Sequence, residues 1–298
     1  MTPKINVIGA GKLGRTLTHL WFNQGVFEIG DVMNRSLQST AAAIVFIGAG
    51  RAVENINSMQ HADVYLLSVP DDAIANCAQR LLESGIVKQE SIIFHCSGAL
   101  PSTVLMPAEL SKELSNIHFA SVHPMRSFAD LMNATENFAG TFCAIEGDSK
   151  AVQTLTDAFE KIGAQMFSVN AQNKTLYHAA CCITSNYLTA LMDFALQCFK
   201  QSGVQGDQAV RIMQPLAQGT LDNIFSLGPV DALTGPIERG DVETVKQQLE
   251  CVMQWDAQAG EFYRLLSNAA LELSRQKGSA SEESLAQLTE LLEKFPRN

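Results

Sequence analysis

Three glycines near the amino terminus form the pattern with the most specific chemistry in this sequence. Gly9, Gly11 and Gly14 match G-x-G-x-x-G, directly after an apolar run over residues 5–8 and directly before a helical run. In this context the first glycine permits a tight turn, the second lets a pyrophosphate approach backbone N–H groups, and the third lets helix and strand pack. We therefore expect the whole turn to bind a dinucleotide, through Gly9, Ala10, Gly11, Lys12, Leu13 and Gly14.

The end of the second expected strand selects between NADP and NAD. NAD enzymes usually place Asp or Glu about 20 residues further on to bind the ribose hydroxyls, whereas NADP selection uses a nearby Arg for the 2′-phosphate. Asp31 and Arg35 compete for this role. If the strand ends at Met33 or Asn34, then Asn34, Arg35 and Ser36 face the ribose, which favours NADP. If Asp31 lies closer to the strand end, NAD is favoured instead.

A second polar turn, Ser68, Val69 and Pro70, follows a buried strand and precedes the acidic start of a helix. In a doubly wound sheet the carboxyl edge of the strands faces the ligand crevice, so we expect these three residues near the nicotinamide. The same residues could only cap the helix, and the two roles are compatible.

Ser97 and His123 are candidates for the proton chemistry that accompanies hydride transfer, because each follows an expected strand at the ligand edge of the sheet. Arg126 could hold a substrate carboxylate with two hydrogen bonds. The alternative for Ser97 is that it only forms a Ser-Gly turn, and the alternative for His123 is a structural role at the end of its strand. His118 lies on the strand face opposite His123, so no metal site is expected.

A polar stripe marks the helix expected over residues 173–201. At 100° per residue its polar side chains fall within an arc of about 120° on an otherwise apolar helix: Lys174, His178, Cys182, Ser185, Asn186 and Thr189. Such a stripe indicates that a ligand or a water-filled cleft lies beside the helix. Of its residues, we expect His178 and Asn186 to be the pair that faces the active site. The alternative is a helix in the protein core whose hydroxyl groups form their hydrogen bonds within the helix itself.

The order of expected elements positions these residues in two domains. Over residues 1–168 helical stretches separate seven β-rich runs: 5–8, 29–33, 64–69, 91–95, 117–122, 141–145 and 165–169. This alternation predicts an α/β fold with a Rossmann-type, doubly wound and mostly parallel sheet. For residues 169–298 the sequence pattern predicts only helices, over residues 173–201, 206–225, 242–278 and 282–294. We expect the reaction centre between the two domains.

Composition excludes several classes of protein. The 298 residues are 46% hydrophobic and carry a net charge of −10, so neither a nucleic-acid partner nor an anionic membrane surface is expected. The longest uncharged helical stretch, 175–192, holds several polar groups that are costly in lipid, so a buried helix is expected there and no membrane span. Seven cysteines without a C-x-x-C pair indicate reduced, buried thiols and a cytoplasmic location.

The motifs together resemble a known superfamily. The glycine pattern, N-R-S at 34–36 and S-V-P-D at 68–71 are similar to reductases whose Rossmann domain precedes a helical domain of the 6-phosphogluconate dehydrogenase type. Pyrroline-5-carboxylate reductase, prephenate dehydrogenase and deazaflavin-dependent NADP oxidoreductase belong to it. Three further motifs, H-C-S-G-A-L at 95–100, V-H-P-M at 122–125 and L-T-G-P-I-E-R-G-D at 233–241, resemble a bacterial family that pairs a Rossmann-like domain with a C-terminal domain of unknown function.

This resemblance covers nearly the whole chain and implies an NADP-dependent oxidoreductase. It also implies that His123 corresponds to the catalytic or substrate-orienting histidine of prephenate dehydrogenases. In related dehydrogenases a Lys and an Asn about one turn apart on the long helix face the active site. Lys174 and Asn186 are twelve residues apart, which departs from that pattern.

The second domain supplies the remaining expectations. Residues 234–241 are expected to form a loop that closes over the cleft, with Thr234 and Arg239 contacting substrate, or with Arg239 paired to Asp241 or Glu238. The apolar 173–201 helix predicts a homodimer formed through this domain. The expected function is hydride transfer between NADP and a small, anionic metabolite. The alternative is a non-catalytic dinucleotide sensor or scaffold.

Overall fold

The chain forms two compact units, residues 1–185 and 186–298. The computed structural model describes residues 2–106, 116–204 and 206–294. Every described strand belongs to the first unit, and the last of them ends at Ser168. The two units divide after residue 185, later in the chain than the boundary after residue 168 that we predicted. The helical segment after that strand starts in the first unit and continues into the second.

A single eight-stranded sheet organises the first unit, in the order β3-β2-β1-β4-β5-β6-β7-β8. Its strands are β1 (Lys4–Ile8), β2 (Glu28–Met33), β3 (Arg51–Ala52), β4 (Val64–Leu67), β5 (Ile92–His95), β6 (His118–Pro124), β7 (Phe142–Gly147) and β8 (Gln165–Ser168). All neighbouring strands run parallel except β6 and β7. The predicted mostly parallel sheet and its seven predicted strands are confirmed. The two residues of β3 are too few to give a pattern in the sequence.

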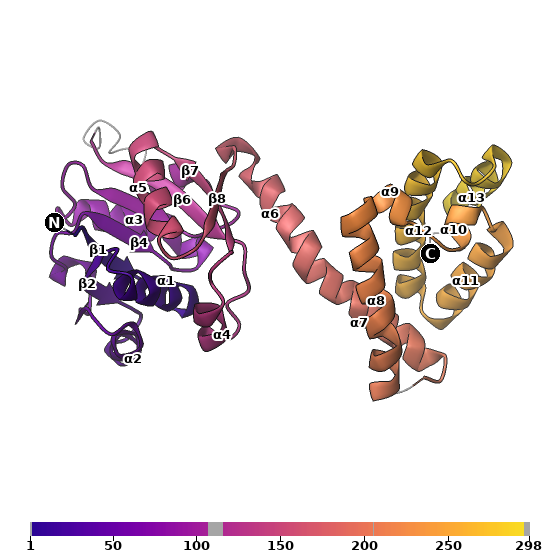
Figure 1. Cartoon of the computed structure of the whole chain (residues 1–298), viewed down its shortest axis with the longest axis horizontal. Helices are drawn as coiled ribbons and strands as arrows, with labels where there is room; N and C mark the ends of the chain where they lie inside the picture. The colour runs from indigo at the N-terminus through magenta and orange to yellow at the C-terminus, as the bar shows by residue number, and fades with distance from the viewer. Residues whose placement is uncertain (1, 107–115, 205, 295–298) are drawn as a thin grey trace. The chain divides into compact units, whose positions relative to one another are not determined.

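Helices cover both faces of this sheet (Figure 1). They are α1 (Lys12–Asn23), α2 (Leu37–Ile47), α3 (Asp71–Glu83), α4 (Leu131–Glu136) and α5 (Ser149–Glu160), with 3₁₀ turns at Ile56–Ser58, Ser102–Leu105 and Ala171–Asn173. Successive residues of a strand point to opposite faces, so Val7 and Ile8 enter two different cores. Val7 packs in the core that contains Trp21 of α1, and Ile8 in the core that contains Leu81 of α3.

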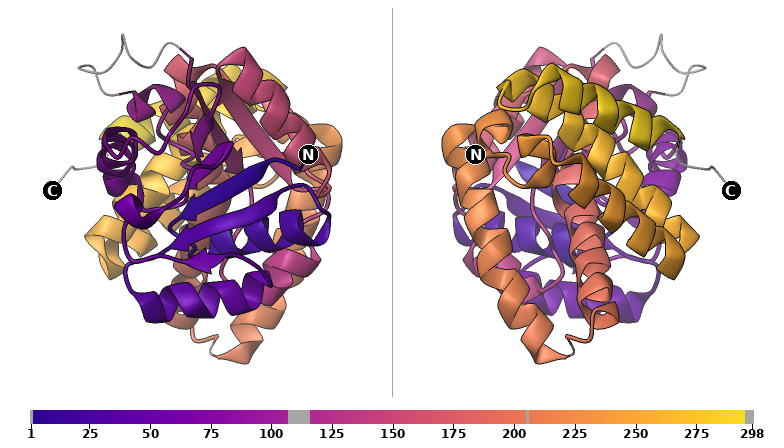
Figure 2. Two further views of the ribbon diagram at one scale, coloured as in Figure 1. Left: turned by 90° about the vertical axis from the view of Figure 1, so that its left-hand side faces the viewer. Right: turned by 90° about the vertical axis from the view of Figure 1, so that its right-hand side faces the viewer.

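The helices after the sheet confirm the predicted all-helical region (Figure 2). They are α6 (Lys174–Cys182), a π-helical segment (Ile183–Tyr187), α7 (Leu188–Gln201), α8 (Asp207–Leu227), α9 (Pro229–Ala232), α10 (Pro236–Arg239), α11 (Val242–Trp255), α12 (Ala257–Lys277) and α13 (Glu282–Lys294). The helix predicted over 242–278 is interrupted at Asp256. Its carboxylate accepts a hydrogen bond from the Ala259 backbone N–H at 2.7 Å and so begins α12.

Residues 234–241 do not form the open loop that we predicted. Pro236 starts the short helix α10, and Ile237 is buried in the core of the second unit. The Ser274 hydroxyl donates a hydrogen bond to the Ile237 carbonyl at 3.1 Å. Arg239 forms no salt bridge with Glu238 or Asp241, the alternative that we considered: Glu238 lies 3.7 Å from Lys277, and the Asp241 carboxylate caps α11 by accepting from the Thr244 N–H. The hydrogen bonds from Thr244, and then the charge of Arg239, lower the pKa of Asp241.

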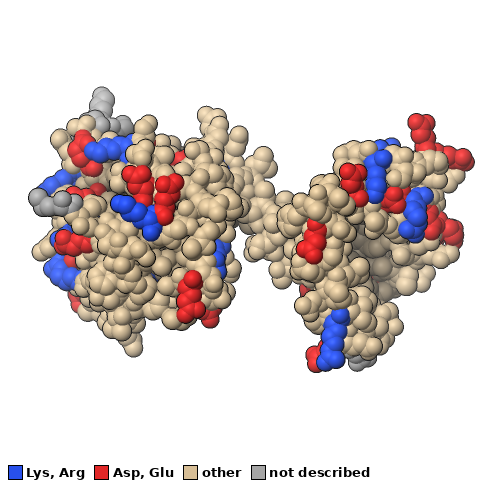
Figure 3. Space-filling view, in the orientation of Figure 1, with Lys and Arg blue, Asp and Glu red and all other residues tan. Residues whose placement is uncertain are grey.

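Burial differs from our expectation in two places. The helical stretch 171–201 is long and apolar enough to cross a membrane by length and composition alone, but none of its most apolar window is buried within the chain. The prediction that the helix over residues 175–192 is buried is therefore wrong for a single copy of the chain. Only Cys77 and Cys143 are buried among the seven cysteines, and Cys251 is exposed. Charged side chains of both signs are interspersed on the visible face of each unit (Figure 3).

Candidate functional site

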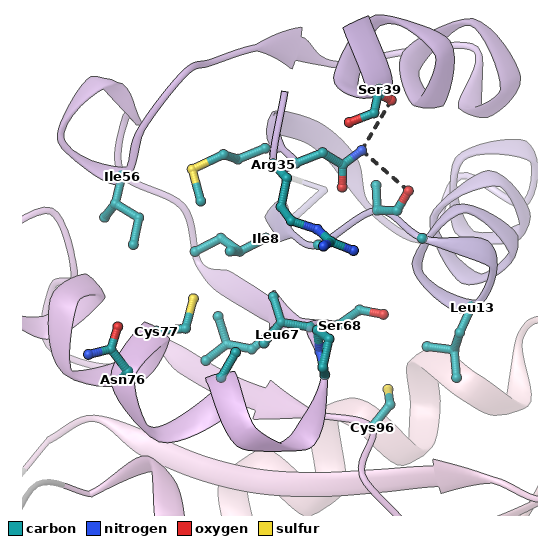
Figure 4. A pocket seen from close by; sticks show the side chains of 18 of the residues that line it. Ile8, Leu13, Arg35, Ser39, Ile56, Leu67, Ser68, Asn76, Cys77 and Cys96 are labelled. Carbon is teal, nitrogen blue, oxygen red and sulfur yellow. Dashed lines mark hydrogen bonds between the residues drawn. The ribbon is translucent and has the colours of Figure 1, made fainter. Parts of the chain in front are cut away.

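A cavity of about 1130 Å³ opens at the carboxyl edge of the sheet in the first unit (Figure 4). The turns that follow β1, β2, β4 and β5 line it. All of the residues that we predicted to bind the cofactor line this cavity except Gly14, and so does Ser97. The crossover between β1 and β4 brings these turns together, as expected at a topological switch point.

The three glycines of the first turn have three different surroundings. Gly9 has a φ of +90°, and a Cβ there would lie 2.5 Å from the Ser68 carbonyl oxygen. A Cβ on Gly14 would lie 2.8 Å from the Gly9 oxygen, so this residue lets α1 approach the turn. A Cβ on Gly11 would meet nothing within 4 Å, although this residue also lines the cavity. The open space in front of Gly11 is where backbone N–H groups at the start of α1 can receive a phosphate.

The turn after β2 presents one free cation to the cavity. Asn34 is held in place, because its side-chain amide donates to the carbonyls of Ser39 at 3.1 Å and Ala10 at 3.4 Å. The Ser36 hydroxyl caps α2 by accepting from the Ser39 N–H at 3.2 Å. Arg35 extends into the cavity, and among the described residues it has no hydrogen-bond or ion-pair partner.

Asp31, the competing candidate, does not line the cavity. It is 3% exposed, and both of its carboxylate oxygens accept hydrogen bonds from the Arg51 guanidinium, at 2.7 and 2.9 Å. The Gln60 backbone N–H adds a third bond at 2.6 Å. Burial opposes ionisation of Asp31, but these hydrogen bonds outweigh it and lower the pKa of the carboxyl. This acid therefore fixes β3 beside β2 and is not available to a ribose.

We did not predict several polar residues that line the cavity: Arg15, Ser39, Asn55, Asn76 and Arg80. Arg15 follows Gly14 directly, and its guanidinium donates to the carbonyls of Ala10 at 3.0 Å and Ser39 at 3.4 Å. Its place on the first turn of α1 is the one signal in the sequence that could have identified it. The others enter the cavity only because β2 and β4 lie on either side of β1, which brings α2, α3 and the turn after β3 to the same edge of the sheet.

The hydrogen bonds of the Ser97 hydroxyl hold the turn after β5 in place. It donates to Asp71 Oδ2 at 2.8 Å and accepts from the backbone N–H groups of Ala99 at 3.2 Å and Leu100 at 3.0 Å. Asp71 is the first residue of α3, so this bond connects the turn after β5 to the start of α3. Ser97 reaches the cavity as part of a fixed turn.

His123, at the end of β6, lies beside two residues of α6. Its Nδ1 lies 2.8 Å from the Tyr177 hydroxyl, and the ring packs edge-to-face on both Tyr177 and His178. Gly98 makes room for both imidazoles, because a Cβ there would lie 2.3 Å from His178 Cδ2 and 2.8 Å from His123 Nε2. The structure therefore brings together two of the predicted catalytic residues, His123 and His178, against the Gly98 turn.

Burial keeps two histidines of this region uncharged. It lowers the pKa of His123 to about 4, with further lowering by His178 and Lys174 and an opposing effect of Asp71. It also lowers the pKa of His95 to about 4. The tautomer of His95 follows from its partners: the Ser97 backbone N–H can only donate to Nδ1, so Nε2 carries the hydrogen and donates to the Pro101 carbonyl.

Lys174, the first residue of the polar stripe, is buried in the first unit. It is 1% exposed, and its ammonium group donates to the Ser121 hydroxyl and to Glu146 Oε1. Glu146 also accepts from the backbone N–H and the hydroxyl of Ser102, both at 2.7 Å. Burial lowers the pKa of Lys174, and Glu146 opposes that change. This lysine thus attaches α6 to β6 and β7.

The remaining predicted residues are not in this cluster. The Arg126 guanidinium donates to the Asn137 carbonyl and, at 3.4 Å, to Asn133 Oδ1, so it holds the segment around α4. Asn186, Thr234 and Arg239 belong to the second unit.

Solved structures with the same fold extend over nearly the whole chain. A protein from Thermotoga maritima has a TM-score of 0.72 at 24% identity, over 92% of this chain and 99% of its own. A Bacteroides fragilis protein provisionally named an NADP oxidoreductase has a TM-score of 0.69 at 22% identity, over 90% and 97%. Pyrroline-5-carboxylate reductase from Coxiella burnetii has a TM-score of 0.56 at 15% identity, over 94% and 100%.

One further structure is prephenate dehydrogenase from A. aeolicus, in complex with hydroxyphenyl propionate and NAD+, with a TM-score of 0.54 at 14% identity over 93% and 98%. Two of the relatives implied by the motifs are therefore confirmed as structural relatives. At these identities the likeness concerns the fold. A search of curated protein sequences found no match.

Two family models match the sequence itself. The model of a Rossmann-like domain matches residues 2–117, and the model described as a domain of unknown function (DUF2520) matches residues 141–270. The chain belongs to the proteins that pair a Rossmann-like domain with a DUF2520 domain.

Proposed function

We propose that this protein is an NADP-dependent oxidoreductase that transfers a hydride to or from a small metabolite. The observation that carries the proposal is the contrast between Arg35, which extends into the cavity and has no partner among the described residues, and Asp31, whose carboxylate accepts hydrogen bonds from Arg51 and Gln60. A guanidinium favours the 2′-phosphate of NADP, and the acid that would favour NAD is occupied.

The surroundings of the glycine turn fit the rest of a dinucleotide. Gly11 leaves open space beside the first backbone N–H groups of α1, where a pyrophosphate is stabilised by those donors and by the helix dipole. Ser68, Val69 and Pro70 line the same cavity on the side of β4 and would lie along the nicotinamide half. Bound in this way, the cofactor would supply or accept the hydride.

We assign the substrate chemistry to the cluster around Gly98. His123 and His178 converge there, and Ser97 holds the turn between them and the cavity. Asn186, on the same polar stripe as His178, is proposed as a further substrate contact. An uncharged His123 would act through hydrogen bonds, as a neutral imidazole does when it polarises a carbonyl.

The proposal that the substrate is anionic depends on the second unit. Arg126 already donates to Asn137 and Asn133, so it does not support a bidentate contact with a carboxylate. Arg239 forms no ion pair with any residue in the described ranges, and with Thr234 it remains the candidate for binding an anionic group.

Titration of NADPH and NADH, followed by their intrinsic fluorescence, tests the cofactor assignment. Arg35→Ala should weaken NADPH binding about 10- to 150-fold and leave NADH nearly unchanged, because a charge-assisted hydrogen bond is worth about 1.5 to 3 kcal/mol. Lys88→Ala removes an equal charge from an exposed position outside the cavity and should change neither affinity. Equal losses for both cofactors, or tighter NADH binding by the wild type, would contradict the assignment.

A second variant tests the site itself. Gly11→Val places a side chain in the open space of the turn without backbone strain and should weaken NADPH by at least about tenfold, since overpacking costs about 1 to 3 kcal/mol. Gly219→Val, in open space on α8, is the matched control. NADPH oxidation with any member of a panel of carbonyl and imine compounds would identify an enzyme. Binding without turnover across the panel would favour the dinucleotide sensor.

A further inference from the structure

Tyr177 is the one hydrogen-bonding partner of His123 among the described residues. Its hydroxyl lies 2.8 Å from Nδ1, and the two rings meet at 83° with their centroids 5.7 Å apart. The other ring nitrogen, Nε2, has no hydrogen-bond partner in the described part of the chain and lies next to Gly98. One ring nitrogen of His123, Nδ1, is therefore hydrogen-bonded within the protein, and the other, Nε2, is available for a further hydrogen bond.

The direction of the hydrogen bond between His123 and Tyr177 decides which nitrogen carries the hydrogen. A neutral imidazole has one N–H and one lone pair. If the phenol donates to Nδ1, the hydrogen is on Nε2, beside Gly98 and His178. If Nδ1 donates to the phenol, Nε2 is an acceptor and the phenol must donate elsewhere.

The surroundings of Tyr177 favour donation to His123. The alternative acceptor within hydrogen-bond reach of the phenol is the Cys181 thiol, one turn further along α6. Sulfur is a weak acceptor, whereas an imidazole nitrogen lone pair is a strong one. The phenol also stays protonated, because burial raises the pKa of Tyr177 well above its usual value.

We propose that Tyr177 is a positioning residue that fixes the tautomer of His123, so that Nε2 carries the hydrogen and serves as the hydrogen-bond donor to the substrate. The role toward substrate rests on the proposed oxidoreductase function, whereas the tautomer belongs to the protein alone. A donor held in place by a neighbouring side chain can stabilise charge that develops on a substrate oxygen or nitrogen without reorganising. Tyr177 itself touches neither substrate nor cofactor in this arrangement.

Nitrogen NMR of the full-length protein without ligands tests the tautomer directly. Labelling histidine with ¹⁵N separates protonated from unprotonated ring nitrogens, and His123→Gln assigns the resonances of this ring. In the wild type we expect the Nε2–H form of His123 in at least about tenfold excess at neutral pH, which matches the typical strength of one hydrogen bond. In Tyr177→Phe the excess should fall severalfold, by about the factor that one hydrogen bond is worth, toward the weaker preference for Nε2–H that a neutral histidine ring has by itself.

Two controls separate this effect from damage to the fold. His95 reports folding in the same spectrum, because Ser97 and Pro101 fix its Nε2–H tautomer independently of Tyr177. Cys181→Ala removes the competing acceptor and should leave the tautomer of His123 unchanged. An unchanged tautomer in Tyr177→Phe, or a Nδ1–H form in the wild type, would overturn the proposal.

Kinetics then test the consequence for the reaction. With a substrate found by screening, Tyr177→Phe should lower kcat about tenfold or more and leave NADPH affinity within about threefold. The change in tautomer alone accounts for less than about twofold of this loss, and the remainder is expected because the imidazole loses the hydrogen bond that fixes its orientation. Unchanged kcat in a variant whose tautomer is mixed would overturn the role toward substrate. Failure of the wild type to bind NADPH would contradict the proposed function and leave the NMR result on the tautomer standing.

Discussion

The ammonium group of Lys174 lies 3.4 Å from Glu146 Oε1, and both side chains are buried. Lys174 begins α6 and Glu146 lies on β7, so this ion pair joins the helix that carries Tyr177 and His178 to the sheet that carries His123. The Ser121 and Ser102 hydroxyls supply further hydrogen bonds to the pair. A polar residue that marks a ligand-facing stripe in the sequence is thus an internal anchor.

Breaking this ion pair on one side should be costly. Lys174→Met leaves the Glu146 carboxylate buried without its cation and should lower the free energy of unfolding by about 3 to 5 kcal/mol. Lys174→Met combined with Glu146→Leu should recover most of that loss, because apolar residues can replace a buried pair. Urea denaturation measures both variants. Lys4→Met, which breaks an exposed pair with Glu28, should change little, and an equally small effect of Lys174→Met would contradict the buried pair.

Gly98 should tolerate no side chain. The methyl group of Gly98→Ala would lie 2.3 Å from His178 Cδ2 and 2.8 Å from His123 Nε2, so the imidazoles must move apart. We expect turnover to fall about 10²-fold, since small misplacements of reacting groups have effects of this size, with NADPH affinity within about threefold. Gly219→Ala on α8, where a Cβ meets nothing within 4 Å, is the control. Normal turnover by Gly98→Ala would show that these two histidines are not the reaction centre.

His123→Ala and Asn186→Ala should separate binding from turnover. Neither residue lines the dinucleotide cavity, so each variant should bind NADPH within about threefold of the wild type. Each should lower turnover by about 10²-fold or more, the usual contribution of acid–base or positioning groups. Fluorescence titration and steady-state rates measure the two effects. Unimpaired turnover in both variants would move the chemistry elsewhere in the molecule.

Stability should fall as the solution becomes acidic. Burial lowers the pKa of His95 from 6.5 to about 4, so between these values the unfolded chain binds a proton that the folded chain does not. The free energy of unfolding therefore decreases as pH falls through this window, by about 2 to 3 kcal/mol from His95 between pH 7 and pH 4.5. Urea denaturation at both pH values should show a loss smaller by that amount in His95→Gln. His61→Gln, whose ring contacts the Ile86 carbonyl instead, should retain the wild-type loss, and identical losses in all three proteins would refute the assignment.

We expect a homodimer assembled through the second unit, as the sequence predicts. Ile212, Leu216 and Leu227 are exposed on α8 and, at spacings of four and eleven residues, fall on one stripe of the helix. Light scattering should give twice the chain mass at micromolar concentration. Leu216→Glu should give the monomer mass, whereas Val45→Glu, at an equally apolar exposed position on α2 of the first unit, should not. A wild-type monomer would end this proposal, and the predicted cytoplasmic location is tested separately by cell fractionation.

Local patterns determined the fold and the cofactor cavity. Alternation of apolar runs predicted seven strands and the change to helices, because period-2 and period-3.6 patterns reflect one-sided burial within a short segment. The glycine turn and the residues Asn34, Arg35 and Ser36 were predictable for the same reason, since each turn is built by consecutive residues at the end of one strand.

Tertiary structure decided the partners of the polar side chains. No local signal distinguishes Asp31 from a ribose-binding acid, and only the position of β3 brings Arg51 to it, 20 residues later in the chain. The sequence placed Lys174 and His178 on one stripe of the long helix, but in the structure Lys174 is buried and binds Ser121 of β6 and Glu146 of β7, whereas His178 packs on His123. A side chain's hydrogen-bond partners depend on which distant segments share its surroundings, and a sequence pattern records only its neighbours along the chain.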